Sequence, residues 1–255
     1  MCLAPEEVDA ARAMRDHRAV QFLGGRIALR RAMSLLLGQD LASSVAPVLR
    51  DHRGAPLLPS DTLRGSISHK DQVAVALACA PLDPLQGAEE QDHNARGLGD
   101  GAVDATASTG LRRFSAVGID IENLALERRS DLLRRKILNP AEVARLGALA
   151  SAGLTEDQEI LLYFSLKESV YKAIDPFLER YVGFKEVEVE PLLDGTCTAS
   201  VCATALESEQ EPFNTEEAKD SDTDLKSPPD LILQGHWRLI ADYALTAISA
   251  RRVER

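Results

Sequence analysis

Residues 117–122 read Val-Gly-Ile-Asp-Ile-Glu, and this alternation restricts the fold more than any other segment of the chain. Successive side chains of a β-strand point to opposite faces, so Asp120 and Glu122 share one face and the apolar side chains share the other. Two neighbouring carboxylates repel each other unless a cation lies between them. Gly118 precedes them on the same face and would leave room for a ligand. The pattern predicts a strand with one buried face and Mg²⁺ ligands on the other, although a strand end whose acids face water has the same pattern.

Periodicity, prolines and capping residues predict the remaining elements. The expected helices cover residues 5–16, 18–37 and 127–136, with another after Asn139 and one from Thr155 to Ile174, ended by Asp175 and Pro176. The expected strands cover residues 63–68, 72–78, 115–121, 184–190, 196–203, 231–240 and 243–250. Helices combined with a few antiparallel-looking strands in each half indicate an α+β fold.

The net charge of −11 is concentrated in two segments of low hydrophobic periodicity. Residues 206–230 hold nine acids and two lysines, and residues 83–113 hold six acids and three arginines, so the rest of the chain carries a net charge of −1. Both segments are expected to be insertions, the first disordered and the second mobile. The negative net charge of the chain argues against a nucleic-acid-binding surface. The residues outside the two acidic segments still include basic side chains that can bind an anionic ligand.

The four cysteines match neither a zinc pattern nor a disulfide framework, which favours a reducing, intracellular setting. The first twenty residues lack an apolar segment of signal-peptide length, and no later segment is long and apolar enough to span a membrane. We therefore expect a cytoplasmic protein, monomeric and without membrane contact.

Two further motifs place polar side chains together. In Phe164–Ala173, Glu168 and Lys172 are four residues apart and share a helix face; they could bind a metal and a phosphate, or form an ordinary surface ion pair. In Gly65–Lys70, Ser68 and His69 end a strand and could donate to a phosphate, although a histidine in a polar turn is the commoner explanation.

The order of these motifs, SISH, then GIDIE, then a Lys-Glu-Ser helix, resembles the 4′-phosphopantetheinyl transferases. It is most similar to the larger single-chain type that activates peptide, polyketide and siderophore synthases, and the likeness extends from about Arg26 to Tyr243, apart from the two insertions. The resemblance implies a pseudo-dimer of two similar α+β halves, residues 1–113 and 114–255, with the ligand cleft between them. It implies transfer of phosphopantetheine from coenzyme A to a serine of an apo acyl or peptidyl carrier protein, as in the holo-acyl-carrier-protein synthase type.

The resemblance also implies roles for individual residues. The metal ligands for Mg²⁺ would be Asp120, Glu122 and Glu168. The coenzyme A contacts would be Arg26, Arg53, Ser68, His69, Lys167 and Lys172. The catalytic residues would be Glu142, Glu168 and Lys172.

Two questions stay open at this stage. The base that accepts the serine proton could be Glu142 or a water on the metal, but Glu142 is also the third residue of a helix capped by Asn139, where glutamate is common for structural reasons. The same carboxylates would serve a Mg²⁺-dependent hydrolase of nucleotide pyrophosphates, and a degenerate relative could bind coenzyme A or a carrier protein without transfer.

Overall fold

The computed structural model describes residues 3–38, 46–58, 60, 63–80, 116–125, 130–178, 180–201 and 230–253. Its α-helices are α1 (Pro5–Arg12), α2 (Asp16–Leu37), α4 (Ser130–Ile137), α5 (Pro140–Ala144) and α6 (Glu156–Leu178), with short 3₁₀ helices η2 (Ala150–Ala152) and η3 (Phe184–Glu186). Its strands are β1 (Leu49–Arg50), β2 (Pro56–Leu57), β3 (Arg64–Lys70), β4 (Val73–Cys79), β5 (Ala116–Asn123), β6 (Val187–Pro191), β7 (Thr196–Val201), β8 (Leu231–Ile240) and β9 (Tyr243–Arg252).

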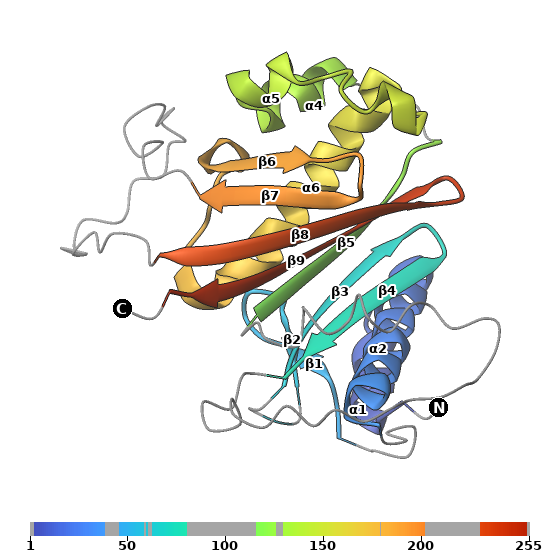
Figure 1. Ribbon diagram of the computed structural model, residues 1–255. Coiled ribbons are helices and arrows are strands. Elements are labelled where there is room, and N and C mark those ends of the chain that lie inside the picture. The colour runs from blue at the N-terminus through green and yellow to red at the C-terminus, as the bar shows by residue number, and fades with distance from the viewer. Residues whose placement is uncertain are drawn as a thin grey trace, which may run out of the picture.

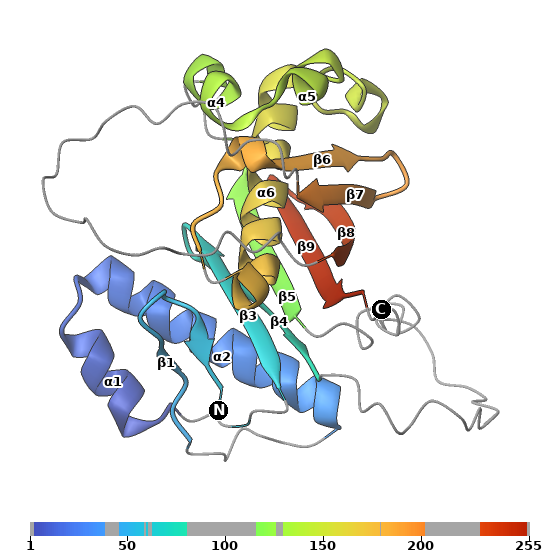
Figure 2. The same cartoon turned by 90° about the vertical axis from the view of Figure 1, so that its left-hand side faces the viewer.

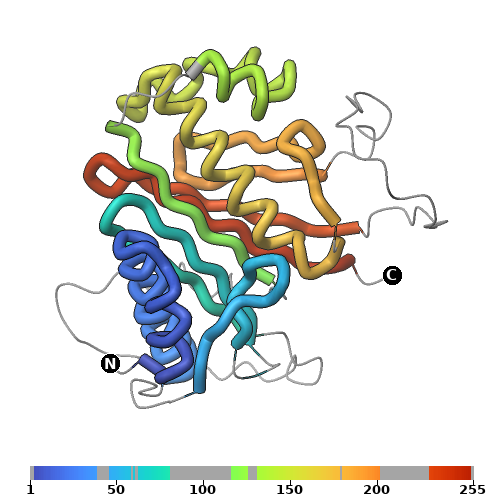
Figure 3. The backbone as a smooth tube through the Cα atoms, turned by 180° about the vertical axis from the view of Figure 1, so that it is seen from behind, coloured from blue at the N-terminus to red at the C-terminus, as the bar shows by residue number. Residues whose placement is uncertain are grey.

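The C-terminal region is built on a five-stranded antiparallel sheet in the order β5-β9-β8-β7-β6 (Figure 1). The register places Asp120 opposite Thr246 and Glu122 opposite Ala244 on β9. Helix α6 lies diagonally across one face of this sheet, as the view from behind shows (Figure 3). It begins at a capping box in which Thr155 and Gln158 exchange hydrogen bonds of 3.0 and 3.3 Å, as their spacing predicts.

The N-terminal region is the antiparallel pair β3–β4 covered by α2, with α1 beside it, and it lies at the opposite end of the molecule from α4 and α5 (Figure 2). Helix α2 approaches the hairpin closely because it carries a glycine at the contact. A Cβ at Gly25 would lie 2.6 Å from Cγ2 of Ile67. Close packing therefore explains a residue that would otherwise only weaken the helix.

The two regions meet along β3 and β5, which lie side by side (Figure 1). Every second residue of β3 contacts β5 through its side chain, and the contacts advance along both strands in the same direction. These contacts are Ile119 N to Ser66 Oγ at 3.1 Å, Ser68 Oγ to Asp120 Oδ1 at 2.7 Å and Lys70 Nζ to Glu122 Oε2 at 2.6 Å. The seam between the two regions is therefore polar, and the carboxylates of β5 lie in it.

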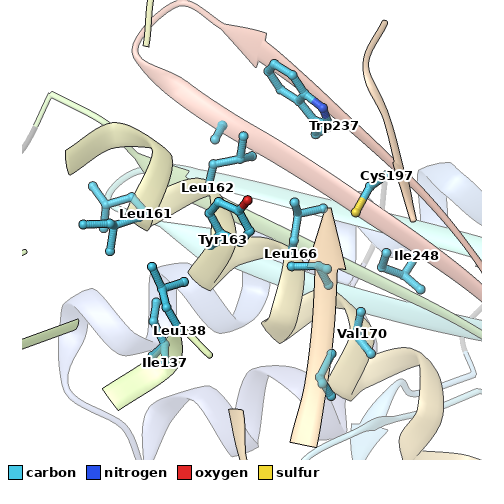
Figure 4. Close-up of a cluster of buried hydrophobic side chains, with 14 of the residues drawn as sticks. Ile137, Leu138, Leu161, Leu162, Tyr163, Leu166, Val170, Cys197, Trp237 and Ile248 are labelled. Carbon is cyan, nitrogen blue, oxygen red and sulfur yellow. The ribbon is translucent and has the colours of Figure 1, made fainter. Parts of the chain in front are cut away.

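The larger hydrophobic core lies between α6 and the five-stranded sheet (Figure 4). Its centre is formed by aliphatic side chains, in keeping with the low aromatic content of 4%. The labelled members are Ile137, Leu138, Leu161, Leu162, Tyr163, Leu166, Val170, Cys197, Trp237 and Ile248. Burial of so many large side chains fixes α6, and with it Glu168 and Lys172, on the sheet.

Two local expectations are wrong. The space beside Gly118 is filled by helix backbone and leaves no room for a ligand, because a Cβ there would lie 1.9 Å from the carbonyl oxygen of Ser169. Helix α6 does not stop before Pro176 but continues to Leu178. Pro176 has no backbone N–H, so the carbonyl of Lys172 lacks its usual helical hydrogen bond. The helix tolerates this loss because it falls in the last turn.

The α+β class is confirmed, and most of the described helices and strands lie close to their expected ranges. Strands β1 and β2 were not expected, and the expected strand 184–190 begins with the 3₁₀ helix η3. The expected insertions, residues 83–113 and 206–230, lie outside the described residues except for Asp230. Cys79 and Cys197 are buried free thiols. None of the helices in the described segments of the chain combines the length and apolar character needed to cross a membrane.

Candidate active site

A cavity of about 320 Å³ lies where α2, the loop after β1, β3 and α6 meet. Its lining includes the side chains of Arg18, Arg26, Arg50, His69 and Lys172. The remaining lining residues are Gly54, Pro56, Ile67 and Ser68, so no carboxylate lines it. Four cations around one cavity repel one another, and the arrangement suits a ligand with several negative charges.

Arg26 is the most deeply placed of these cations, with 2% of the residue exposed. Its Nε donates to the carbonyl of Val48 at 3.0 Å, and its guanidinium lies 3.7 Å from the ring centroid of Phe22. Its Nη2 is buried without a hydrogen-bond partner among the described residues. Burial, together with the charge of Arg50, lowers the pKa of Arg26 to about 10. A buried donor without a partner is costly, so this group is prepared for an acceptor from outside the chain.

His69 lines the same cavity and is half-buried. Burial lowers the pKa of His69 most, and the charge of Arg18 lowers it further. The neutral imidazole is therefore favoured in the free protein, because protonation would add one more cation to the cluster.

Asp120 lies behind the cavity wall and is 5% exposed. Its Oδ1 accepts from Ser68 Oγ and from Lys172 Nζ, each at 2.7 Å, and its Oδ2 accepts from Ser165 Oγ at 2.9 Å. Lys172 also donates to the carbonyl of Ile119 at 3.0 Å. Lys172 on α6 therefore pairs with Asp120 on β5, although its helical spacing suggested Glu168 as the partner.

Glu168 lies close to both strand carboxylates. Burial raises the pKa of Glu168 most; the Lys172 ammonium lowers it, and the negative charges of Asp120 and Glu122 raise it. The three predicted metal ligands thus influence one another through space. Their oxygens are the hard donors that Mg²⁺ prefers, so the donor set fits that ion.

The described residues nevertheless contain no group of three or more His, Cys, Asp or Glu side chains already gathered as metal ligands. The physical reason lies in the counter-charges. Lys172 Nζ lies 2.7 Å from Asp120, and Lys70 Nζ lies 2.6 Å from Glu122. Two ammonium groups hold the carboxylates that were expected to share a metal.

Glu142 and Lys167 lie away from this cavity, in the core between α5, α6 and β6. Glu142 is 0% exposed and Lys167 is 1% exposed, and Lys167 Nζ lies 2.7 Å from Glu142 Oε2. Glu142 also accepts from the backbone N–H groups of Asn139 and Val189, each at 2.9 Å. The capping interpretation of Glu142 is therefore the one that its contacts support, and the structure does not bring it to the cavity as a base.

The same contacts correct the expectation that Lys167 binds coenzyme A. Its ammonium donates to three backbone carbonyls, each at 2.8 Å: those of Ile137, Phe184 and Val187. With its charge paired to Glu142, Lys167 joins three segments of the core. It has no path to a ligand, because it is almost fully enclosed.

Arg53 is likewise engaged elsewhere. Its guanidinium forms a two-pronged ion pair with Asp175 near the end of α6, with Nε 3.1 Å from Oδ2. It also donates to the carbonyl of Arg180 at 3.4 Å. Arg53 thus ties the loop after β1 to α6, and it is the neighbouring Gly54 that lines the cavity.

Two of the cavity cations, Arg18 and Arg50, were not among the site residues predicted from the sequence. A signal was present for Arg18, because Arg18, Phe22 and Arg26 recur every four residues and therefore share one face of α2. Arg50 had no such signal. It lies in a two-residue strand whose direction depends on its pairing with Pro56.

Comparison with known proteins found two family models that match this chain. The family model for the 4′-phosphopantetheinyl transferase superfamily matches residues 116–225, and that for the 4′-phosphopantetheinyl transferase N-terminal domain matches residues 6–79. No curated protein gives a match.

Among solved structures, the Chronobacterium ammoniagenes ACPS-CoA complex aligns with 18% identity and a TM-score of 0.35, over 55% of this chain and 98% of that one. The Helicobacter pylori holo-acyl-carrier-protein synthase in complex with coenzyme A aligns with 16% identity and a TM-score of 0.32, over 53% and 99% of the two chains. The two family models together extend over both sides of the β3–β5 seam, and the chain belongs to the 4′-phosphopantetheinyl transferase superfamily.

Proposed function

We propose that this chain transfers 4′-phosphopantetheine from coenzyme A to a serine of an apo acyl or peptidyl carrier protein and releases adenosine 3′,5′-bisphosphate. The observation that carries the proposal is the cavity lined by four cations, with the buried Nη2 of Arg26 lacking an acceptor among the described residues, directly beside the carboxylates of β5. Coenzyme A carries a pyrophosphate and a 3′-phosphate, so its charge complements this cavity. We further propose a cytoplasmic, monomeric protein.

The anion-binding residues would be Arg26, Ser68, His69 and Lys172, joined by Arg18 and Arg50. Arg26 would receive the 3′-phosphate, because it lines the cavity and its buried Nη2 has no acceptor among the described residues. Ser68 and His69 would donate to pyrophosphate oxygens. Arg53 and Lys167 are left out of this set, since their charges are paired with Asp175 and Glu142.

Asp120, Glu122 and Glu168 would hold Mg²⁺. When bound there, the ion would offset negative charge on the pyrophosphate. Burial raises the pKa of Glu168 most, and the negative charges of Asp120 and Glu122 raise it further. A divalent cation would relieve that repulsion, which supports this assignment.

The transfer itself requires one proton acceptor and one stabilised leaving group. The serine oxygen of the carrier protein would attack the phosphorus nearest the pantetheine, and the bond from that phosphorus to the bridging oxygen of the pyrophosphate would break. Glu168 would accept the serine proton, because Glu142 is fully buried and paired with Lys167. Lys172 would stabilise the charge that develops on the departing adenosine 3′,5′-bisphosphate.

We also propose that the chain forms a pseudo-dimer of two similar halves, residues 1–113 and 114–255. In both halves a long helix packs on antiparallel strands, α2 on β3–β4 and α6 on β5–β9, and the proposed cleft lies at their seam. The two halves would thus contribute different groups to the site. The first half would supply most of the cations that bind the anion, and the second half would supply the carboxylates that hold the metal.

The proposal is tested by intact-mass measurement. The protein is mixed with Mg²⁺, coenzyme A and a panel of apo carrier proteins, and a gain of one phosphopantetheine that a chelator abolishes would support it. Asp120→Asn should remove the gain while Glu188→Gln, at the ion pair with Arg145 away from the cavity, should keep it. Cleavage of coenzyme A without carrier modification would instead identify a hydrolase. Binding without either reaction would identify a carrier- or coenzyme A-binding module.

A further inference from the structure

Lys70 is a charged residue of the seam to which the proposed reaction assigns no task. Its Nζ lies 2.6 Å from Oε2 of Glu122, and the two side chains are 19% and 8% exposed. The pair forms because β3 and β5 lie side by side. Ser68 and Lys70 share one face of β3, and they reach Asp120 and Glu122, which share one face of β5.

The charges of the site show why this pair matters. Asp120, Glu122 and Glu168 bring three negative charges together, and Lys70 and Lys172 supply two positive charges. Counted over these described residues, the metal-free site carries a net charge of −1. An ammonium 2.6 Å from Glu122 Oε2 takes up space beside that oxygen which a metal cation bound to it would also need.

The two lysines are not equivalent. Lys172 lines the cavity and also donates to the carbonyl of Ile119, so it stays useful to an anionic substrate when its pair with Asp120 loosens. Lys70 is absent from the cavity lining. Its side chain is partly exposed at the end of the hairpin, where Asp71 begins the turn with a φ of 52°. It can therefore withdraw into water when Glu122 takes another cation.

We propose that Lys70 is an internal counter-ion, which holds Glu122 in the metal-free protein and competes with Mg²⁺ for it. This inference rests on the proposed function, because it assumes that Glu122 is a metal ligand. The pair gives a buried carboxylate a nearby counter-charge before the metal arrives. In return, binding of Mg²⁺ has to displace the ammonium and is weaker than the three carboxylates alone would allow.

The test measures metal affinity directly, without coenzyme A or carrier protein. Mg²⁺ and Mn²⁺ are titrated calorimetrically into the chelator-stripped wild type, Lys70→Gln, Lys70→Arg and the control Lys185→Gln, a lysine of η3 outside the seam. A charge-assisted contact of ordinary strength corresponds to an increase of about 10- to 100-fold in metal affinity when its donor loses its charge. Lys70→Gln should show that increase, while Lys70→Arg and Lys185→Gln should stay near the wild type.

Thermal unfolding provides the second readout. Lys70→Gln should melt below the wild type in the presence of a chelator, and saturating Mg²⁺ should remove most of the difference. If the wild type binds Mg²⁺ and folded Lys70→Gln binds it with unchanged or weaker affinity, the inference about Lys70 is overturned. That result leaves the proposed transferase function unaffected. A failure of every variant, the wild type included, to bind either metal overturns both the inference and the assignment of the three carboxylates.

Discussion

Replacement of Glu142 by glutamine separates a structural role from a catalytic one more sharply than any other change in this chain. The carboxylate is fully buried, and its three described partners are all donors: the Asn139 and Val189 N–H groups and the Lys167 ammonium. Glutamine offers one acceptor oxygen and one NH₂ group, so at least one of these donors would face another donor. The Lys167 charge would also lose its counter-charge inside the core.

The magnitude follows from that geometry. Breaking a buried ion pair by removing one partner costs about 3–5 kcal/mol. For a chain of this size, 1 kcal/mol shifts the melting temperature by about 2–4 °C, so Glu142→Gln should melt roughly 6–20 °C below the wild type. Phosphopantetheine transfer per folded molecule, measured well below that temperature, should stay within a few-fold of the wild type.

The matched control is Glu188→Gln. Glu188 pairs with Arg145 at 2.9 Å, but the two side chains are 32% and 33% exposed. Loss of such a pair should change the free energy of unfolding by less than about 1 kcal/mol. The reasoning fails if Glu142→Gln keeps the wild-type melting temperature while its turnover falls by about 10²- to 10⁴-fold, because that is the signature of a lost general base.

Two other predictions concern packing and pH. Gly118→Ala places a Cβ 1.9 Å from the Ser169 carbonyl oxygen and should lower the free energy of unfolding in urea by about 3 kcal/mol or more. In the control Gly24→Ala the new Cβ would lie 3.4 Å from its nearest neighbour, so this change should be neutral or stabilising. Equal effects of the two substitutions would contradict the packing argument. The lowered pKa of His69 means that the free protein holds it neutral, so binding of an anion at the cavity should raise that pKa and take up a proton. Affinity for adenosine 3′,5′-bisphosphate should therefore increase as the pH falls from about 8 to about 6. His69→Gln should lose most of this dependence in calorimetry, and an unchanged pH profile would rule His69 out as its source.

Local sequence signals predicted those elements of the fold that depend on near neighbours. The alternation in residues 117–122 placed Asp120 and Glu122 on one face of β5, and the register with β9 agrees with that alternation. Asn139 and Thr155 begin helices as their side chains predict, because a cap bonds to a backbone N–H only three residues away. Such contacts are short in sequence and need no knowledge of the rest of the chain.

The same local logic could not assign partners that lie on different helices and strands. Lys172 lies four residues from Glu168 on α6, yet it pairs with Asp120 on β5. Lys167 immediately precedes Glu168, but it points into the core towards Glu142, because residues one apart on a helix point in different directions. A motif of adjacent charged residues therefore contains one buried structural lysine and one carboxylate near the cavity.

By itself the sequence determined the class of fold, the caps, the carboxylate face of β5 and the family, since periodicity, turn chemistry and motif order are properties of the chain. The tertiary structure decided which charges meet: Arg18 and Arg50 with Arg26, Lys70 with Glu122, and Lys167 with Glu142. Such groups lie far apart along the chain, as Ser68 and Asp120 do at a separation of 52 positions, and they meet only where helices and strands pack. The energy of a charge depends on its burial and on its neighbours in space, and the amino-acid sequence alone specifies neither.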